Sequence, residues 1–336
     1  MTLRDGRGAT SSGQAQAGGR IRIGTRGSAL ALAQTGMIGD RIAKASGLDV
    51  DIVTIATEGD HSTASLASLG GTGVFASALR EALLRDECDL IVHSFKDLPT
   101  APYPGLRIGA IPKREDARDA LCARDGLTLE GLAAAARVGT GSPRRAAQLR
   151  ALRPDVEVVD IRGNVDTRLR RVADGDLDAV ILAAAGLTRL GRLDAITEFF
   201  DLARWATAPA QGALAIEVRE AQSPETQSPE LAAVLTAIDH GPTRMSALAE
   251  RAVLARLEAG CAAPVGASAV VDGEMLFLTA TVYSIDGSRS LTSSHALVIE
   301  GSAAERALLP QELGGRVAEE LLRLGAAELA PLGSGS

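Results

Sequence analysis

The sequence DLIVHSFKDLP spans residues 89–99 and joins a short apolar run to a polar one. Residues 90–92 are continuously apolar, which is typical of a parallel strand that is covered on both faces. The polar side chains that follow this run are those of His93, Ser94, Lys96 and Asp97. In open α/β sheets ligands bind at the carboxyl ends of the strands, so we expect a binding site here.

Lys96 and Asp97 set a cation beside a carboxylate. We expect Lys96 to be permanently charged and to keep Asp97 ionised, even where the carboxylate is partly buried. An ionised carboxylate at a strand end would stabilise a positive charge that develops on a ligand. The alternative interpretation is a strand end that carries an exposed ion pair.

The composition predicts a globular protein of two or three α/β domains, because 336 residues with 46% hydrophobic content can bury ordinary cores. A net charge of -7 and 2% aromatic residues argue against a nucleic-acid partner. No apolar run approaches the roughly 20 residues that cross a bilayer, so we expect no membrane partner.

Residues 1–19 are rich in Gly, Ser, Ala and Gln, and we expect a disordered tail without a signal peptide. The three cysteines, Cys88, Cys122 and Cys261, are far apart and form no Cys-x-x-Cys pair. This pattern argues against a disulfide framework and against a metal site, and it favours a reducing cytoplasm.

A second feature is the segment TGSPRR at residues 140–145, which follows a predicted strand. Ser142 suits the N-cap of a helix and Pro143 its first position. Arg144 and Arg145 then lie in the first turn, where the helix dipole disfavours each cation by about 0.3–1 kcal/mol. This placement suggests a bound anion, and an arginine-rich surface turn is the alternative.

The same construction recurs at other predicted strand ends, which carry Arg26, Arg162, Arg168 and Arg189. If one cleft collects these side chains, its ligand carries several carboxylates or phosphates, because guanidinium groups pair with both in bidentate fashion. The glycines of residues 70–73 lack the spacing of a nucleotide-binding loop.

The C-terminal part of the chain has a different pattern. A long amphipathic helix is predicted over residues 243–257, and strands over residues 268–271, 275–284 and 290–299. The Asp-Gly pairs between these strands predict hairpin turns. Helical patterns from 303 to 329 complete a small α+β unit.

Six short motifs occur in a fixed order along the chain. They are RGS at 26–28, HSFKDLP at 93–99, SPRR at 142–145, RGN at 162–164, AGL at 185–187 and EAGC at 258–261. With these motifs the chain, from about residue 20 to about residue 329, strongly resembles the hydroxymethylbilane synthase family, also called porphobilinogen deaminases.

The resemblance implies a fold of two α/β domains, each like those of type II periplasmic binding proteins, and a small α+β C-terminal domain. The first domain is expected at residues 20–114 and 213–230, because the chain returns to it after the second domain. The second is expected at 115–212 and the third at 240–330.

The resemblance also implies a transferase of tetrapyrrole and haem biosynthesis, expected to act as a monomer. Family members carry a dipyrromethane cofactor as a cysteine thioether and add four porphobilinogen units to it. Each addition releases ammonia and passes through an azafulvene cation, and hydrolysis then releases the linear product hydroxymethylbilane.

Transferred to this chain, the family's site assigns the cofactor thioether to Cys261 and the catalytic carboxylate to Asp97. The residues implied to bind the cofactor's acetates and propionates are Lys96, Ser142, Arg144 and Arg145. Those implied to bind the substrate are Arg26, Ser28, Arg162, Arg168 and Arg189.

The chain departs from the family pattern in two places. Ser68 and Thr72 stand where many members carry lysines, so a basic lid is not expected here. Gly141 stands where a serine is usual, so one hydroxyl contact to the cofactor is expected to be missing.

The main alternative is a two-lobed protein that binds or senses a small dicarboxylate. It would explain the arginines, but it leaves the third unit and the Gly260-Cys261 loop without a role. A nicotinamide-dependent enzyme is disfavoured by the missing glycine fingerprint.

Overall fold

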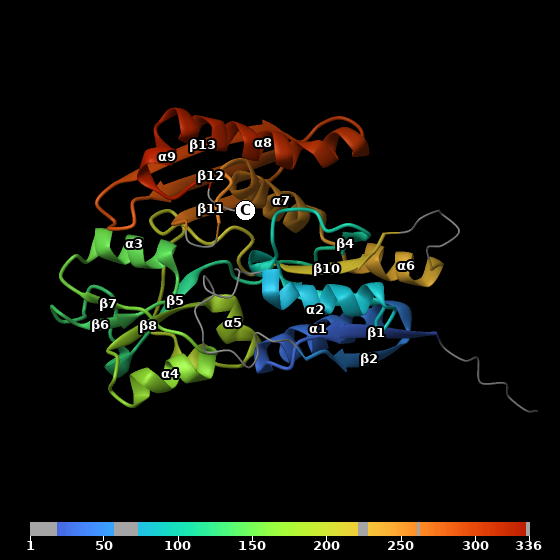
Figure 1. Cartoon of the computed structure of the whole chain (residues 1–336), viewed down its shortest axis with the longest axis horizontal. Coiled ribbons are helices and arrows are strands. Elements are labelled where there is room, and N and C mark those ends of the chain that lie inside the picture. Colours follow the sequence, from blue (N-terminus) through green and yellow to red (C-terminus); the bar gives the residue numbers. More distant parts are fainter. Residues whose placement is uncertain (1–18, 57–72, 221–227, 261–262, 334–336) are drawn as a thin grey trace, which may run out of the picture.

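The computed structural model describes residues 19–56, 73–220, 228–260 and 263–333, and in these ranges the chain forms three β-sheets (Figure 1). Apart from Gly19, the expected tail lies outside the described residues, and so do Ser68 and Thr72. No helix in the described ranges is long and apolar enough to cross a membrane.

Strand β3, Leu90–Ser94, is the middle strand of the first sheet, whose order is β2-β1-β3-β10-β4. It runs parallel to β1 but antiparallel to β10, so the predicted parallel pairing is correct on one side only. His93 and Ser94 belong to the strand instead of following it. The other strands are β1 (Arg20–Thr25), β2 (Asp49–Thr54), β4 (Leu106–Ala110) and β10 (Leu214–Arg219).

Helices cover both faces of this sheet, as the apolar run predicted. Leu90 and Val92 pack in a core with α1 (Ala29–Ser46) and α6 (Pro229–Ile238), whereas Ile91 packs with α2 (Gly73–Leu84) on the opposite face. Ser28 is the N-cap of α1, and its hydroxyl accepts a hydrogen bond from the Ala31 N–H at 3.3 Å.

The second sheet repeats this plan in the order β7-β6-β8-β5-β9, and β8 lies between a parallel and an antiparallel neighbour. Its strands are β5 (Asp119–Ala123), β6 (Arg137–Gly139), β7 (Glu157–Val159), β8 (Ala179–Ala183) and β9 (Glu198–Phe199). Its helices are α3 (Pro143–Leu152), α4 (Val165–Ala173) and α5 (Ala184–Arg189). Ser142 caps α3, as predicted, and Asn164 caps α4.

Two segments cross between these lobes, residues 111–118 before β5 and residues 200–213 before β10. They touch where the Glu115 N–H donates to the Gly212 carbonyl at 3.2 Å. Gly212 has a φ of +83°, and a Cβ built there would lie 2.5 Å from the Glu115 carbonyl oxygen, so only glycine fits this crossing.

The third domain, orange to red in Figure 1, lies across both lobes. Its antiparallel sheet β11-β12-β13 is covered by α7 and α8, which share one apolar core with it. The elements are α7 (Gly241–Arg256), β11 (Val265–Asp272), β12 (Met275–Tyr283), β13 (Ser290–Val298), α8 (Ala303–Arg323) and α9 (Ala326–Leu329). The predicted fold class, two α/β units and a small α+β unit, is confirmed.

Candidate active site

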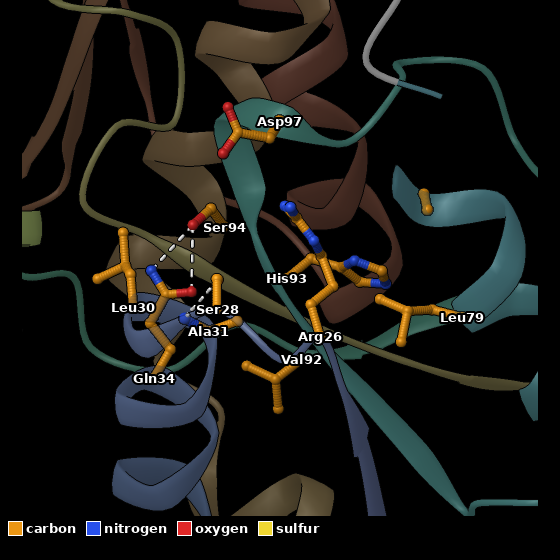
Figure 2. Close-up of a pocket in the computed structure, with 11 residues that line it drawn as sticks. Arg26, Ser28, Leu30, Ala31, Gln34, Leu79, Val92, His93, Ser94 and Asp97 are labelled. Atoms are coloured by element: carbon orange, nitrogen blue, oxygen red, sulfur yellow. Dashed lines mark hydrogen bonds between the residues drawn. The ribbon is translucent and has the colours of Figure 1, made fainter. Parts of the chain in front are cut away.

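A cavity of about 110 Å³ opens at the carboxyl ends of β1 and β3, against the first turn of α1 (Figure 2). This is the sheet edge at which the sequence predicted a ligand site. Its polar lining residues are Arg26, Ser28, Gln34, His93, Ser94 and Asp97. Three of these, Arg26, Ser28 and Asp97, are predicted site residues, and the cavity brings them together.

Asp97 ends a single 3-10 turn, η2 (Phe95–Asp97), directly after β3. Its side chain is exposed, and in Figure 2 the Arg26 side chain extends toward it from the end of β1. A carboxylate in this position can meet a positive charge on a ligand without first breaking a buried ion pair.

Lys96 differs from the expectation of a permanent cation. The side chain is half-buried, and its ammonium donates to the Gln211 side-chain oxygen at 3.2 Å. Burial lowers its pKa to about 8; Asp97 opposes the shift and Arg145 adds to it. Lys96 is therefore less strongly basic than an ordinary lysine, because burial disfavours its charged form.

The wall of the cavity is held by hydrogen bonds that the sequence did not predict. The Gln34 amide donates to the Ser94 hydroxyl at 2.9 Å (Figure 2). Behind them Arg80 grips Glu217 through two hydrogen bonds of 2.9 Å, and His93 Nε2 lies 3.3 Å from the same carboxylate. Burial would raise the pKa of Glu217, but the hydrogen-bonded Arg80 and the nearby His93 outweigh it and lower that pKa.

A buried charge cluster in the second lobe contains Arg144 and Arg145, and its centre is Asp119. One Asp119 oxygen accepts from Arg144 at 2.9 Å and the other from Arg145 at 2.6 Å. The Trp205 ring nitrogen and the Gln211 amide each donate to this carboxylate at 2.8 Å. The sequence suggested that Arg144 and Arg145 bind an anion. In the structure, the anion beside both arginines is the Asp119 carboxylate.

The cluster nevertheless keeps an excess of positive charge. Burial would raise the pKa of Asp119, but Arg144 and Arg145 hold it far below its usual range, so the carboxylate carries one full negative charge. Two guanidinium groups face it, which leaves one positive charge uncompensated, whereas a protonated Lys96 has Asp97 as a counter-charge. A site with such an excess favours a further anion.

The other predicted arginines lie in two places. Arg168 donates to the Gly163 carbonyl at 2.8 Å, and Arg162 lies 3.5 Å from Asp160. Burial, then the positive charges of Arg145 and Arg162, lower the pKa of Arg168 to about 10, which marks these arginines as electrostatic neighbours.

Arg189 lies apart from that group. It donates to the Gly212 carbonyl at 2.6 Å, and the charges that act on it are those of Glu115 and Arg41. Its Nε is buried and lacks a hydrogen-bond partner among the described residues. The structure therefore places Arg189 at the crossing between the lobes and not beside Asp97.

Cys261 lies outside the described residues, and only the ends of its loop can be located. Glu258 has a left-handed φ of 49°, Ala259 bridges to Leu332, and the Ala263 N–H donates to the Gly260 carbonyl at 3.0 Å. The other two cysteines are buried, and burial raises the pKa of Cys88 to about 11 and that of Cys122 to about 12. Thiols of this kind stay protonated and are poor nucleophiles.

No metal centre accompanies these residues in the part of the chain that the structure describes, since no three His, Cys, Asp or Glu side chains are grouped there as ligands. The charged groups of the site are instead the arginines, Lys96 and Asp97.

Comparison with known proteins gives the same family for both halves of the chain. The model "Porphobilinogen deaminase, dipyromethane cofactor binding domain" matches residues 21–227, and "Porphobilinogen deaminase, C-terminal domain" matches residues 245–323. The porphobilinogen deaminase of Leifsonia xyli subsp. xyli is 61% identical over 94% of this chain and 95% of its own length. That of Cutibacterium acnes is 53% identical over 93% of this chain and 97% of its own.

Among solved structures, the methionine-binding protein MetQ is 12% identical and covers 65% of this chain and 89% of its own, with a TM-score of 0.42. The family models and the curated relatives carry the assignment, because they span both α/β lobes and most of the C-terminal domain. The chain belongs to the porphobilinogen deaminase family.

Proposed function

We propose that the chain is a hydroxymethylbilane synthase, a transferase that condenses four porphobilinogen molecules stepwise onto a covalent dipyrromethane and then releases hydroxymethylbilane by hydrolysis. The observation that carries this proposal is the pairing of one exposed carboxylate, Asp97, with a cationic cluster that begins at the adjacent residue, Lys96. The first can stabilise a cationic reaction centre, and the second can hold the carboxylates of a polyanionic pyrrole chain.

The residues present fit the dipyrromethane group. The positive charge left over around Asp119 matches a ligand with several carboxylates, and Arg144, Arg145, Lys96 and the Ser142 hydroxyl would hold them. Cys261 would carry the thioether. When bound, dipyrromethane supplies a nucleophilic pyrrole α-carbon, which no protein side chain can offer.

Asp97 would do two things during each condensation. Its carboxylate would accept and return a proton at a pyrrole nitrogen, and its negative charge would stabilise the cation that porphobilinogen becomes as ammonia leaves. Arg26 and Ser28, which line the same cavity, would bind the acetate and propionate groups of the incoming porphobilinogen.

The remaining arginines would extend this binding surface. Arg168 and Arg162, electrostatic neighbours of the Asp119 cluster, would bind substrate side chains from the second lobe. Arg189 would do so from the crossing segments, where its Nε has no hydrogen-bond partner among the described residues.

The sheet order supports a division into domains at 20–114 with 213–230, 115–212 and 240–330, because β10 returns to the first sheet after the second is complete. We further propose a cytoplasmic monomer. Two free, buried cysteines are consistent with a reducing compartment.

Intact-mass measurement tests the cofactor assignment directly. The purified protein should exceed its sequence mass by one dipyrromethane, and Cys261→Ser should remove this mass. Cys88→Ser and Cys122→Ser, which change buried thiols, should keep it. A fully active protein with the bare sequence mass would contradict the assignment.

Asp97→Asn tests the enzymatic role against the alternative of a small-anion binding protein. The amide keeps the size of the side chain but loses its charge, so ammonia release from porphobilinogen should fall about 10²- to 10⁴-fold while the cofactor is retained. Release at the parent rate by the loaded variant would show that the carboxylate has no catalytic role.

A further inference from the structure

Arg251, on α7 of the third domain, reaches into the first lobe and contacts the segment that carries Asp97. Its Nη1 donates to the Phe95 carbonyl at 2.9 Å and to the Leu98 carbonyl at 2.8 Å, and its Nη2 donates to the Pro99 carbonyl at 2.6 Å. The guanidinium also lies over the Phe95 ring, 4.4 Å from its centroid. Every one of these contacts is to residues 95–99.

The chemical setting of Arg251 is unusual for a buried cation. Its exposed fraction is 7%, and no carboxylate of the described residues forms an ion pair with it. Burial and the nearby charge of Arg80 lower its pKa to about 10. Burying a charge without a counter-charge lowers the stability of the folded protein. The arginine is therefore expected to have a role at the place where it is buried.

Arg244, earlier on the same helix, provides the contrast. It forms an ion pair of 2.8 Å with Asp239 and donates to the Gly109 carbonyl at 3.1 Å. Arg244 therefore links α7 to the first lobe while its charge is neutralised by Asp239. None of these contacts involves residues 95–99. Attachment of the third domain does not by itself require an uncompensated arginine.

Other groups also hold the segment that Arg251 contacts: the Phe95 N–H donates to the Ala213 carbonyl at 3.0 Å, and the Phe95 and Leu98 side chains are buried in one apolar cluster. Turn η2 is closed by one backbone hydrogen bond, from Leu98 N–H to the Phe95 carbonyl at 3.3 Å, and Pro99 has no N–H to donate. The Phe95 carbonyl thus has a second donor, whereas among the described residues Arg251 alone donates to the carbonyls of Leu98 and Pro99. A buried carbonyl without a donor is destabilising, so these two carbonyls depend on the guanidinium group.

We infer that Arg251 is a positioning residue for the reaction: it fixes the backbone of residues 95–99 and so holds the Asp97 carboxylate at the mouth of the cavity. This inference rests on the proposed catalytic role of Asp97. It makes α7 the common support of both reacting partners, because Arg251 precedes Cys261 by ten residues. The helix that leads to the cofactor loop also sets the position of the carboxylate.

Hydrogen exchange followed by mass spectrometry tests the contact without relying on turnover. In Arg251→Met, amide exchange in peptides that cover residues 95–99 should accelerate at least about tenfold. Arg244→Met, the matched control on the same helix, should leave exchange in that segment unchanged. Equal protection of the segment in Arg251→Met and in the parent would overturn the inference.

Kinetics with a double-mutant cycle separate positioning from general structural damage. Arg251→Met should lower kcat about tenfold to a hundredfold with little change in KM, because misplacing a catalytic group by about 1 Å costs this much. In the Asp97→Asn background the same substitution should have almost no further effect, since Arg251 acts through Asp97. Losses that multiply in the double variant would overturn the inference.

Arg251→Lys keeps the positive charge but loses the two-pronged guanidinium donors, so a kcat between those of the parent and Arg251→Met is expected. If Arg251→Met does not fold, Arg251→Lys is used for the test instead. Parent-like turnover and exchange in Arg251→Lys would contradict a role for the forked donors. A parent-like rate for Asp97→Asn alone would overturn the proposed function and this inference with it. If residues 95–99 of Arg251→Met are as protected from amide exchange as in the parent, the positioning role of Arg251 is wrong, but the proposed function is unaffected.

Discussion

Lys96 shows how the charge of the site depends on the protonation of one side chain. It has Asp97 beside it, but Arg145 and Arg144 also act on it, and burial is the largest influence on its pKa. In the protein without its cofactor, the ammonium is therefore close to losing its proton. An anionic ligand would stabilise the charged form and reverse this shift.

The stability of the Cys261→Ser protein, which should carry no cofactor, is expected to depend on pH through Lys96. Below about pH 8 the ammonium is charged in both the folded and the unfolded state, and the folded state bears the full cost of its burial. Between pH 8 and pH 10.5 the folded protein has released this proton while the unfolded chain keeps it, so stability rises with pH.

Lys96→Met in the same background removes this pH dependence. The free energy of unfolding of the parent should therefore rise relative to Lys96→Met by about 1–2 kcal/mol across that window, after allowance for solvent screening of a half-buried group. Urea unfolding at several pH values measures the difference, and Lys44→Met serves as the exposed control. A constant difference from pH 7 to pH 10.5 would contradict the lowered pKa of Lys96.

Candidate site residues in local motifs could be named from the sequence, but the partners that they meet across long separations could not. Ser142, Arg144 and Arg145 form one short segment, whereas Asp119 meets Trp205 and Gln211 over 86 and 92 residues of chain. No periodicity or cap reveals such a partner. Arg251 was missed for the same reason, because its acceptors are backbone carbonyls and carry no sequence signal.

At the scale of elements, those with a local physical signal were predicted to within a few residues. Helix α3 begins at the predicted cap, Ser142, and the strands of the third domain have the predicted Asp-Gly pairs between them. Strands β4, β5 and β9 and helix α6 were not predicted. Strand β9 has two residues and pairs only with β5, so tertiary contact alone creates it.

Gly141 lies in the loop between β6 and α3, where this loop approaches the loop after β7 too closely for a side chain at position 141. A Cβ at this position would lie 2.5 Å from the Ile161 carbonyl oxygen, in the loop after β7. We expect Gly141→Ala and Gly141→Ser to lose about 1–3 kcal/mol of stability each, because the clash arises at the Cβ and a backbone must move. In this chain a serine at position 141 would require these loops to move apart.

Urea unfolding of the two variants measures this cost, and the alanine variant separates the Cβ from the hydroxyl. Gly36→Ala is the control, since Gly36 lies in α1 with no atom within 4 Å of a built Cβ, and it should stabilise the helix. If Gly141→Ser has the same free energy of unfolding as the parent, the loops can move apart without loss of stability and the prediction is wrong.

At the scale of the whole molecule, one buried carboxylate joins all three domains. Glu250, fully buried on α7, forms a bidentate pair with Arg114 of the first crossing segment, at 2.7 and 3.0 Å. It also accepts from the Ala210 N–H of the second crossing segment at 2.6 Å and from the Ala269 N–H of β11 at 2.8 Å. The angle between the lobes is therefore tied to the third domain.

Glu250→Gln should weaken this junction far more than an ordinary ion-pair substitution does. The amide keeps the shape of the side chain, but its NH₂ group must face donors, and Arg114 is left without its buried counter-charge. A loss of about 3–5 kcal/mol in the free energy of unfolding is expected. Glu319→Gln, which breaks the exposed pair with Arg256 in the same domain, should cost at most about 1 kcal/mol. Denaturation of both variants by urea compares the two, and equal losses would mean that Glu250 contributes no more than a surface charge.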